Sequence, residues 1–534
     1  MLECFSMSPY RWVRAISYVY LLVPVTLFSL GWLRRPVGIA IALLLAWTLW
    51  RLWGSGEEPG WSPAAHDIAL VVAVTGAWVL LSGVGGYAFQ NWDHHWRNAV
   101  FHDLIDYGWP VVYSAPERGP IRALVYNVGY WLPAAMAGRY FGWQAANGLL
   151  FLWTWLGAAL VGLQLVRRFG RWSAILLLIG FGGLDALGTL VFSPEPYPGL
   201  WPPISHLEIW SGELQYSSFT TQLFWVFHQA LPAWLCFVLL WNERKREEAP
   251  LLWSLCFFFA PLPAIGWAPF VFVETARRLL DRSMRLAQRL RSLFFAGAPA
   301  AIVVAGVTGV YYAANTAGQK WSLSQVAVGP WLLFILLEGG LLWLLLLWQG
   351  PMDARLLLTG GLLVCIPLLR IGSGRDFVMR ASIPILFYLM LRTGDILFGG
   401  GRSLRVAQPP GENVDAVQSV AGALEAGTAR RRSSGTWRRA ALVGVLAVGT
   451  LTPLYEINRS VYRTLQYYLM PGTQSVRPDT PTLHLTPDVR PEAEHQGLLE
   501  ADELRTLSQL SDETSRNFVG DVRKSWFYTY LADR

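Results

Sequence analysis

The sequence predicts an all-α fold: a polytopic membrane helical bundle of about 11 full spans, with one proline-broken short hairpin and amphipathic loop helices on the outer face. Two observations predict this fold. Of the 534 residues, 53% are hydrophobic and 15% are charged. Apolar runs of about 20 residues also recur along the chain, and a helix of that length crosses roughly 30 Å of hydrocarbon.

The expected spans are apolar runs that cross the membrane as helices. They lie near residues 15–33, 36–53, 67–89, 142–166, 172–193, 218–241, 294–314, 330–349, 355–370, 382–398 and 438–457. Residues 251–275 carry Pro261 and Pro263 at their centre, and two such prolines break a helix, so a hairpin of two short segments is expected there. Residues 121–138 carry Arg122 and other polar groups, which predicts an interfacial or re-entrant helix instead of a full span.

The distribution of basic residues orients the bundle. With 121–138 kept on one side of the membrane, most basic groups fall on the face of Arg11 and Arg14, which the positive-inside rule makes cytoplasmic. We therefore expect a multi-pass protein of the plasma (inner) membrane with its N-terminus inside and its C-terminus outside. Four polar segments then share the outer face: 90–141, 194–217, 315–329 and 370–381.

This orientation divides the chain into five regions. They are two extra N-terminal spans in 1–66, a membrane core in 67–398, a flexible cytoplasmic loop in 399–437, the last span in 438–457, and an outer-face tail in 458–534. The basic amphipathic segment 274–291 is expected along the inner headgroup layer, which makes membrane lipids a partner. The net charge of +7 follows from the basic inner face and implies no nucleic-acid partner.

The first candidate site is a polar island that follows the apolar run ending at Gln90. The island is residues 91–98, and we expect the carboxylate of Asp93 to act as a general base or a divalent-metal ligand, with His95, or its neighbour His94, as the second metal ligand. The neighbouring polar side chains are candidate substrate contacts: His94, His95, Arg97 and His102. Because His95, His102 and Asp106 fall on one helical face, an interfacial helix with its polar face in water is the alternative interpretation.

The second island follows the expected span 172–193 and mixes aromatic with acidic residues, as carbohydrate sites often do. Its candidate substrate contacts are Tyr197, His206, Glu208 and Glu213. The alternative interpretation is a re-entrant loop whose glutamates are solvated. His228 in the following span is ranked lower, because a single histidine within a span is more often a hydrogen-bonded core residue. Asp185 and Glu338 are expected within spans, as polar helix contacts or as the lining of a water-filled cavity.

The third island lies between two late spans and surrounds a Gly-Ser-Gly turn. Its candidate substrate contacts are Arg370, Arg375, Asp376 and Arg380. Guanidinium groups bind phosphate oxygens, and glycines let backbone amides approach, so a phosphate or pyrophosphate suits this pattern. A surface pair of Arg375 and Asp376 beside snorkelling arginines is the alternative interpretation.

The order of these elements resembles the C-type (GT-C fold) membrane glycosyltransferase superfamily, which includes protein mannosyltransferases and aminoarabinose transferases. The resemblance covers roughly residues 70–393. It rests on the acidic residue Asp93 after an early span, the element 124–133 (LVYNVGYWLP), a span closed by 166–171 (VRRFGR), and the proline-broken hairpin. The chain departs from the superfamily pattern, because a single Asp followed by two histidines replaces a paired acidic motif, and two extra spans precede it.

The resemblance implies an inverting transferase that moves a sugar from a polyprenyl-phosphate donor to a glycan, lipid or protein acceptor on the extracytoplasmic face. Asp93 would be its base or metal ligand, and a divalent metal ion is the one cofactor considered. Arg375 and Arg380 would bind the donor phosphate. Two alternatives stay open: a transporter or flippase of lipid-linked saccharide, and a noncatalytic assembly protein whose outer tail recruits partners.

Overall fold

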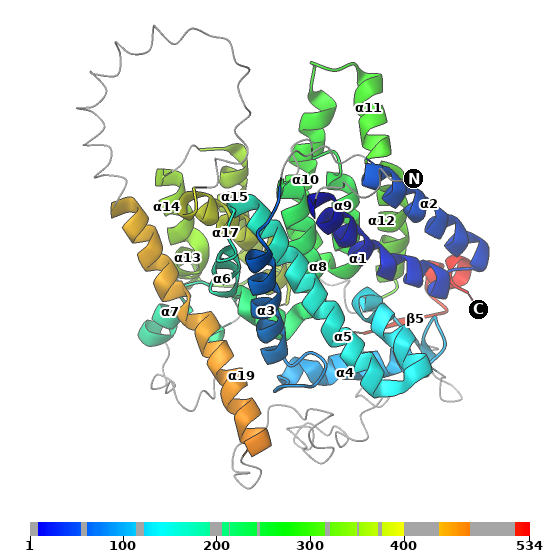
Figure 1. Ribbon diagram of the computed structural model, residues 1–534, viewed down its shortest axis with the longest axis horizontal. Coiled ribbons are helices and arrows are strands. Elements are labelled where there is room, and N and C mark those ends of the chain that lie inside the picture. The colour runs from blue at the N-terminus through cyan, green and yellow to red at the C-terminus, as the bar shows by residue number, and fades with distance from the viewer. Residues whose placement is uncertain are drawn as a thin grey trace.

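A computed structural model describes most of the chain. The described residues are 9–54, 61–113, 122–192, 206–212, 214–242, 246–315, 321–349, 352–371, 376–399, 437–469 and 518–533, and within them the backbone alone is described for Trp92, His95, Tyr467, Tyr468 and Leu469. Helices make up most of these residues, as the sequence predicts (Figure 1).

Helices of very different length build the bundle. In chain order they are α1 (Pro9–Trp32), α2 (Arg35–Gly54), α3 (Ala65–Leu81), α4 (Trp92–Asp106), α5 (Leu132–Phe169), α6 (Ala174–Ile179), α7 (Asp185–Phe192), α8 (Phe219–Asn242), α9 (Ala249–Phe259), α10 (Pro261–Leu280), α11 (Leu286–Phe295), α12 (Ala298–Tyr312), α13 (Val328–Ile335), α14 (Leu341–Gln349), α15 (Ala354–Cys365), α16 (Asp376–Ala381), α17 (Ile383–Leu397) and α19 (Leu451–Leu469). The short strands are β1 (Val112–Tyr113), β2 (Arg122–Leu124), β3 (Trp321–Leu323), β4 (Leu369–Ile371) and β5 (Val519–Asp521).

The described residues contain seven helices that are long and apolar enough to cross a membrane, or eight if the bent pair α11 and α12 is one span. This agrees with a multi-pass membrane protein, but the expected number of about 11 full spans is not confirmed. The seven candidates are Pro9–Trp32, Arg35–Trp53, Val128–Phe169, Phe219–Asn242, Val328–Gln349, Asp376–Leu397 and Trp437–Gln466.

Breaks in the helices account for the difference in number. The predicted span 172–193 is two short helices, α6 and α7, because the backbone leaves helical geometry between them. Here the amide of Leu184 donates to the carbonyl of Leu337 at 3.1 Å. The predicted span 67–89 ends as a helix at Leu81, and glycines of positive φ, beginning with Gly83 at 79°, turn the chain after it.

Two predicted interruptions are present. The segment 251–275 is divided at Ala260 into α9 and α10, which pack against each other as the two arms of a hairpin. In α5, Gly142 has non-helical dihedral angles (φ 81°, ψ 179°), so the part before it is a separate short helix. The predicted interfacial or re-entrant helix 121–138 is helical only from Val128, because residues 122–124 form β2. The short helix before Gly142 does not continue straight into the span that follows.

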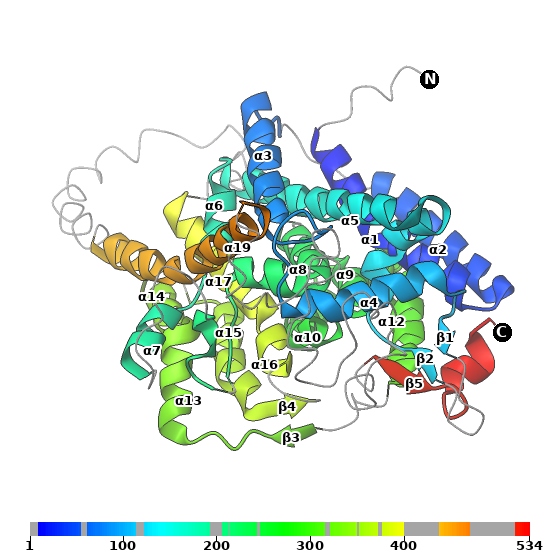
Figure 2. The same cartoon turned by 90° about the horizontal axis from the view of Figure 1, so that it is seen from below.

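Segments that the sequence places on the outer face contact one another at one end of the bundle, here called the loop end. In Figure 1 this end is at the bottom, where α4 lies across the bundle, and Figure 2 views it directly. A three-stranded antiparallel sheet has the order β1-β2-β5, with Ala123 opposite Gly520, and β3 pairs with β4, with Ser322 opposite Arg370. An isolated bridge from Asn315, just after α12, to Gly520 joins the end of that helix to β5.

The opposite end, here called the arginine end, is held by ion pairs between helices that are distant in sequence. Arg168 of α5 binds Asp395 of α17 at 2.8 Å, and Arg392 binds Asp353 at 2.8 Å. Glu274 of α10 accepts from Arg355 at 2.5 Å. Each charge is partly buried and paired, because an unpaired charge beside apolar helices would be costly.

Helix α8 is the centre of the core. Of its most apolar 18-residue window, 94% is buried inside the protein, so it contacts other helices on all sides. Helices α5, α9, α17 and α19 all pack against it. Its path is broken at Val226 (φ −136°, ψ 36°), six residues before Pro232. This break positions the groups of the candidate site.

Helix α10 approaches the backbone of the α16–α17 connection closely at Gly266. A Cβ at this position would lie 1.9 Å from the carbonyl oxygen of Ala381. We expect Gly266→Ala to force the two helices apart and to lower the thermal unfolding temperature in detergent, with a cost of about 1–3 kcal/mol. The matched control is Gly361→Ala on an exposed face of α15, where nothing lies within 4 Å of the new methyl group. Equal melting of both variants would contradict this packing.

Candidate functional site

The first polar island forms the N-terminus of α4. Asn91 caps the helix, and its side chain accepts a hydrogen bond from the amide of Asp93 at 3.1 Å. The carboxylate of Asp93 thus lies in the first turn, where the helix dipole favours a negative charge. One turn later, Arg97 donates to Asp93 at 2.6 Å, and its side chain is only 4% exposed, whereas that of Asp93 is 28% exposed.

Helix α16 repeats this arrangement. Asp376 is its first residue, and Arg380 donates to it from one turn later at 3.0 Å. The carboxylate is again the more exposed partner, at 47% against 12% for the arginine side chain. Two helices from distant parts of the chain therefore each begin with an accessible carboxylate and carry a more buried arginine behind it.

Tyr126 and His228 lie between the two pairs. The hydroxyl of Tyr126, from the segment after β2, is 3.3 Å from Nε2 of His228 in α8. Desolvation raises the pKa of Tyr126, the guanidinium groups of Arg380 and Arg97 lower it, and the two aspartates raise it. Asp93 also acts electrostatically on Arg380. The six residues Asp93, Arg97, Tyr126, His228, Asp376 and Arg380 are here called the arginine cluster.

Several buried polar atoms of this region have no hydrogen-bond partner among the described residues. They are Nη1 of Arg97, Nε of Arg380, Nδ1 of His228, and Oε1 of the adjacent Gln229. A buried donor without a partner is costly, and a charged one more so. Two guanidinium groups with donors to spare, beside a ring nitrogen, provide the hydrogen bonds and charge that a phosphate accepts. The cluster is therefore suited to an anion.

The break in α8 also provides a contact to the other residues of the first polar island, Asn91 and His94. The carbonyl oxygen of Phe224, just before the break, accepts from the side-chain Nδ2 of Asn91 at 2.8 Å and from Nε2 of His94 at 3.0 Å. His94 is 2% exposed, and burial followed by the charge of Arg97 lowers its pKa to about 3. His94 is therefore a neutral hydrogen-bond donor that fixes α4 against α8.

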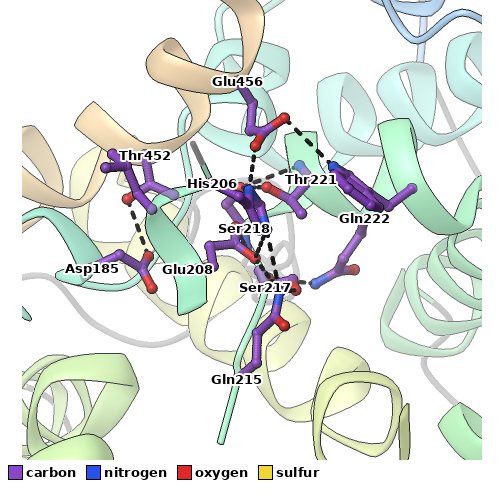
Figure 3. A network of polar contacts seen from close by, with 12 residues as sticks. Asp185, His206, Glu208, Gln215, Ser217, Ser218, Thr221, Gln222, Thr452 and Glu456 are labelled. Atoms are coloured by element: carbon purple, nitrogen blue, oxygen red, sulfur yellow. Dashed lines mark hydrogen bonds and ion pairs between the residues drawn. The ribbon is translucent and has the colours of Figure 1, made fainter. Parts of the chain in front are cut away.

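A second network lies on the other side of the same break and is here called the His206 network (Figure 3). Nδ1 of His206 contacts Glu456 of α19, and Nε2 is 3.7 Å from Glu208. Trp225 of α8 donates to Glu456 at 3.5 Å, and Arg459 pairs with it at 3.6 Å. This network joins the last span to the loop end.

The charges of this network determine the state of His206. Burial lowers the pKa of this ring, but the carboxylates of Glu456 and Glu208 raise it by more, so the net shift is upward. Glu208 itself is fully buried, and accepts from Gln215 and from the amide of Ser218, both at 2.9 Å. Its carboxylate therefore offers no accessible oxygen to a sugar, and it acts here as a partner of His206.

Besides His94, His206 and Glu208, the predicted site residues divide into those that meet in the arginine cluster, those that lie elsewhere, and those outside the described residues. Asp93, Arg97, Asp376 and Arg380 come together. His102 does not join them, because it stacks on Trp143 with ring centroids 3.6 Å apart, farther along α4. Arg370 lies on β4, opposite Ser322. Tyr197, Glu213 and Arg375 lie outside the described residues, as does the side chain of His95.

The predicted metal site at Asp93 and His95 stays a prediction. Among the described residues, no group of three or more histidine, cysteine or acidic side chains could hold a metal ion. Arg97 forms an ion pair with Asp93, so its guanidinium group takes the position that a metal ion would have beside this carboxylate. No family model matches the chain, and neither does any curated protein or solved structure.

Sequence reasoning missed Tyr126 as a member of the cluster and ranked His228 below the loop residues. Nothing in the local sequence marks Tyr126, since it is one aromatic residue among many. His228 had one available signal: it lies four residues before Pro232, and that proline lacks the amide donor that a helix needs there. A polar residue beside a helix-breaking proline is more often exposed to a cavity or ligand than one in a regular helix.

The neutral state of His94 predicts a pH dependence of stability. The unfolded chain takes up a proton near the ordinary histidine pKa of 6.5, whereas the folded protein does so at about 3. Acidification from pH 7 to 5 therefore destabilises the fold through His94. We expect the difference in melting temperature between wild type and His94→Gln to narrow or reverse over this range.

Two comparisons isolate this effect. His206 acts with the opposite sign, because its raised pKa adds stability at low pH that is lost as the pH rises, but it is present in both proteins and cancels in the difference. His66→Gln is the matched control, since that side chain is 71% exposed. A wild-type and His94→Gln difference that stays constant between pH 7 and 5 would show that His94 does not titrate in this way.

Proposed function

We propose that the protein is a membrane glycosyltransferase that moves a sugar from a polyprenyl-phosphate donor to an acceptor hydroxyl on the extracytoplasmic face of the plasma membrane. Its N-terminus would be cytoplasmic and its C-terminus outside. The observation that carries this proposal is the arginine cluster, in which two buried guanidinium groups keep unpaired N–H donors beside accessible carboxylates. An anionic donor and a base are what such a transfer needs.

The reaction step assigns roles to three members of the cluster. Arg97 and Arg380 would bind the phosphate of the donor and stabilise the charge that it gains as the leaving group. The acceptor oxygen attacks the anomeric carbon, the bond from that carbon to the phosphate oxygen breaks, and its electron pair leaves with polyprenyl phosphate. The acceptor proton passes to the carboxylate of Asp93. The sugar product would have inverted configuration.

Donor binding would also prepare the base. In the structure, Arg97 binds Asp93 at 2.6 Å, so the guanidinium group occupies an oxygen of this carboxylate. A donor phosphate competes for the same guanidinium group, so its arrival would release Asp93 for the acceptor. Asp376 and Arg380 form an equivalent pair, which makes Asp376 a further candidate to orient the acceptor. A divalent metal ion, if used, would bind at Asp93.

A second function, transport of a lipid-linked saccharide, is favoured by a different observation. Two buried acids, Asp185 and Glu338, lie where helices are interrupted, between α6 and α7 and between α13 and α14. Transporters often bind their coupling ions at interrupted helices. Such a protein would use the arginine cluster to hold the lipid phosphate and would need no base.

Replacing the carboxylate of Asp93 separates these functions. We expect Asp93→Asn to lose transfer by about 100-fold or more, because general base catalysis contributes about 10²–10⁴. The measurement is product formation from pooled polyprenyl-phosphate sugars and a membrane extract as acceptor, with EDTA added in parallel. Asp106→Asn, on the same helix with a side chain that is 59% exposed, is the matched control and keeps full activity.

The outcomes distinguish the transferase from the transporter. Loss of transfer in Asp93→Asn together with activity in Asp106→Asn supports the transferase, and EDTA sensitivity then shows whether a metal belongs to it. Arg380→Gln should weaken donor binding and leave the pH profile of the residual activity unchanged. If Asp93→Asn keeps wild-type activity, Asp93 is not the base. If wild type transfers nothing but moves labelled donor across liposomes, the protein is a transporter.

A further inference from the structure

Two adjacent residues of α8, His228 and Gln229, carry buried polar atoms to which the reaction step assigns no role. His228 is 0% exposed and Gln229 is 2% exposed. Nε2 of His228 lies 3.3 Å from the side-chain nitrogen of Gln229 and 3.3 Å from the hydroxyl of Tyr126. The other ring nitrogen, Nδ1, has no hydrogen-bond partner among the described residues, and neither has Oε1 of Gln229.

This pair of residues lies beside the two arginines of the arginine cluster. The guanidinium groups of Arg97 and Arg380 both act electrostatically on the ring of His228. That ring stacks on the indole of Trp131, with ring centroids 4.6 Å apart. Nη1 of Arg97 and Nε of Arg380 are also buried without a partner among the described residues. Because most buried polar atoms in native proteins are paired, four unpaired atoms in one region indicate a ligand site.

The ring of His228 is neutral. It is buried beside two guanidinium groups, and a third positive charge in this place would be costly. A neutral imidazole has one N–H donor and one acceptor nitrogen. The ring therefore uses one of these at Nε2, where it meets Gln229, and keeps the other at Nδ1.

The pair retains one free donor and one free acceptor, whichever way the amide of Gln229 is turned. If the amide nitrogen donates to Nε2 of His228, then Nδ1 carries the free N–H and Oε1 is the free acceptor. If the amide is reversed, Nε2 donates to its oxygen, which leaves Nδ1 as the acceptor and the amide nitrogen as the donor. An ionised phosphate offers acceptors alone and cannot satisfy this pair. A hydroxyl group both donates and accepts.

We propose that His228 and Gln229 bind the hydroxyl group at C2 of the donor sugar, while Arg97 and Arg380 hold the phosphate at C1. This inference rests on the proposed function, in which the ligand is a sugar bonded to phosphate. In such a ligand the C2 hydroxyl is the sugar hydroxyl nearest to the phosphate, and the pair lies beside the two arginines. His228 and Gln229 would therefore determine which donor sugars the protein accepts.

Equilibrium binding tests this inference without requiring transfer. The purified full chain in detergent is titrated with polyprenyl phosphate and with its glucose, mannose, 2-deoxyglucose and 6-deoxyglucose derivatives. The 2-deoxyglucose derivative lacks the C2 hydroxyl of both glucose and mannose, so it is the reference for both. We expect at least one of these two sugars to bind about 10-fold or more tighter than the 2-deoxy derivative, because the latter leaves two buried groups unpaired. The 6-deoxy derivative should bind as the glucose derivative does.

One substitution connects this preference to the pair. Gln229→Leu has a side chain of similar size but no amide, and it leaves Tyr126 as the partner of Nε2 of His228. We expect this variant to bind polyprenyl phosphate as wild type does and to lose most of the preference over the 2-deoxy derivative. Arg380→Gln should weaken the binding of all these lipids and keep the preference as a ratio. Asp106→Asn, at an exposed position on α4, should change neither quantity.

Each outcome bears on the proposal. Equal binding of the sugar and 2-deoxy derivatives by wild type overturns it, and this comparison of ligands decides even if Gln229→Leu fails to fold. A preference that folded Gln229→Leu retains also overturns it, because the hydroxyl group is then bound elsewhere. A wild type that shows the preference but transfers no sugar supports the hydroxyl site and contradicts the transferase. A wild type that does not bind polyprenyl phosphate contradicts both.

Discussion

The break of α8 at Val226 is the constraint on which the polar interior depends. A regular helix at the centre of an apolar bundle presents no free backbone groups, but this one offers the carbonyl of Phe224 to Asn91 and His94. Residues on either side of the break point into different clusters: Trp225 toward Glu456, and His228 toward Tyr126. One irregular residue in a buried helix thus fixes α4, α19 and the loop end relative to one another.

Much of the architecture follows from composition and proline placement. The apolar runs predict the long helices, and Pro261 and Pro263 predict the hairpin that divides at Ala260. The distribution of basic residues also predicts that several loops share one side of the membrane, and in the structure these loops pair through β2 with β5 and through β3 with β4. The number of full spans was not predictable, because glycines such as Gly183 and Gly339 break helices only through the contacts that surround them, which the chain does not reveal locally.

The candidate site was predictable in its parts and not in its assembly. Asp93 and the arginine-rich turn at 370–380 are visible as polar islands, yet the sequence gives no reason for Arg97 and Arg380 to meet around Tyr126. That juxtaposition depends on long-range packing. The partners of Glu456 and Asp185 were hidden for the same reason, although Asp185 itself was expected as a polar group within a span, since such an acid shows its partner only when the helices are assembled.

The pairing of β2 with β5 has a consequence for biogenesis. The hydroxyl of Tyr528 donates to the carbonyl of Leu124, 404 residues earlier in the chain, and β5 forms the edge of the sheet that β1 and β2 begin. During synthesis, the loop that bears Asp93 emerges long before the strand that completes its sheet. The helices between β2 and β5 are therefore made while this loop end is still open, and the sheet can be completed only after residues 519–521 have been made.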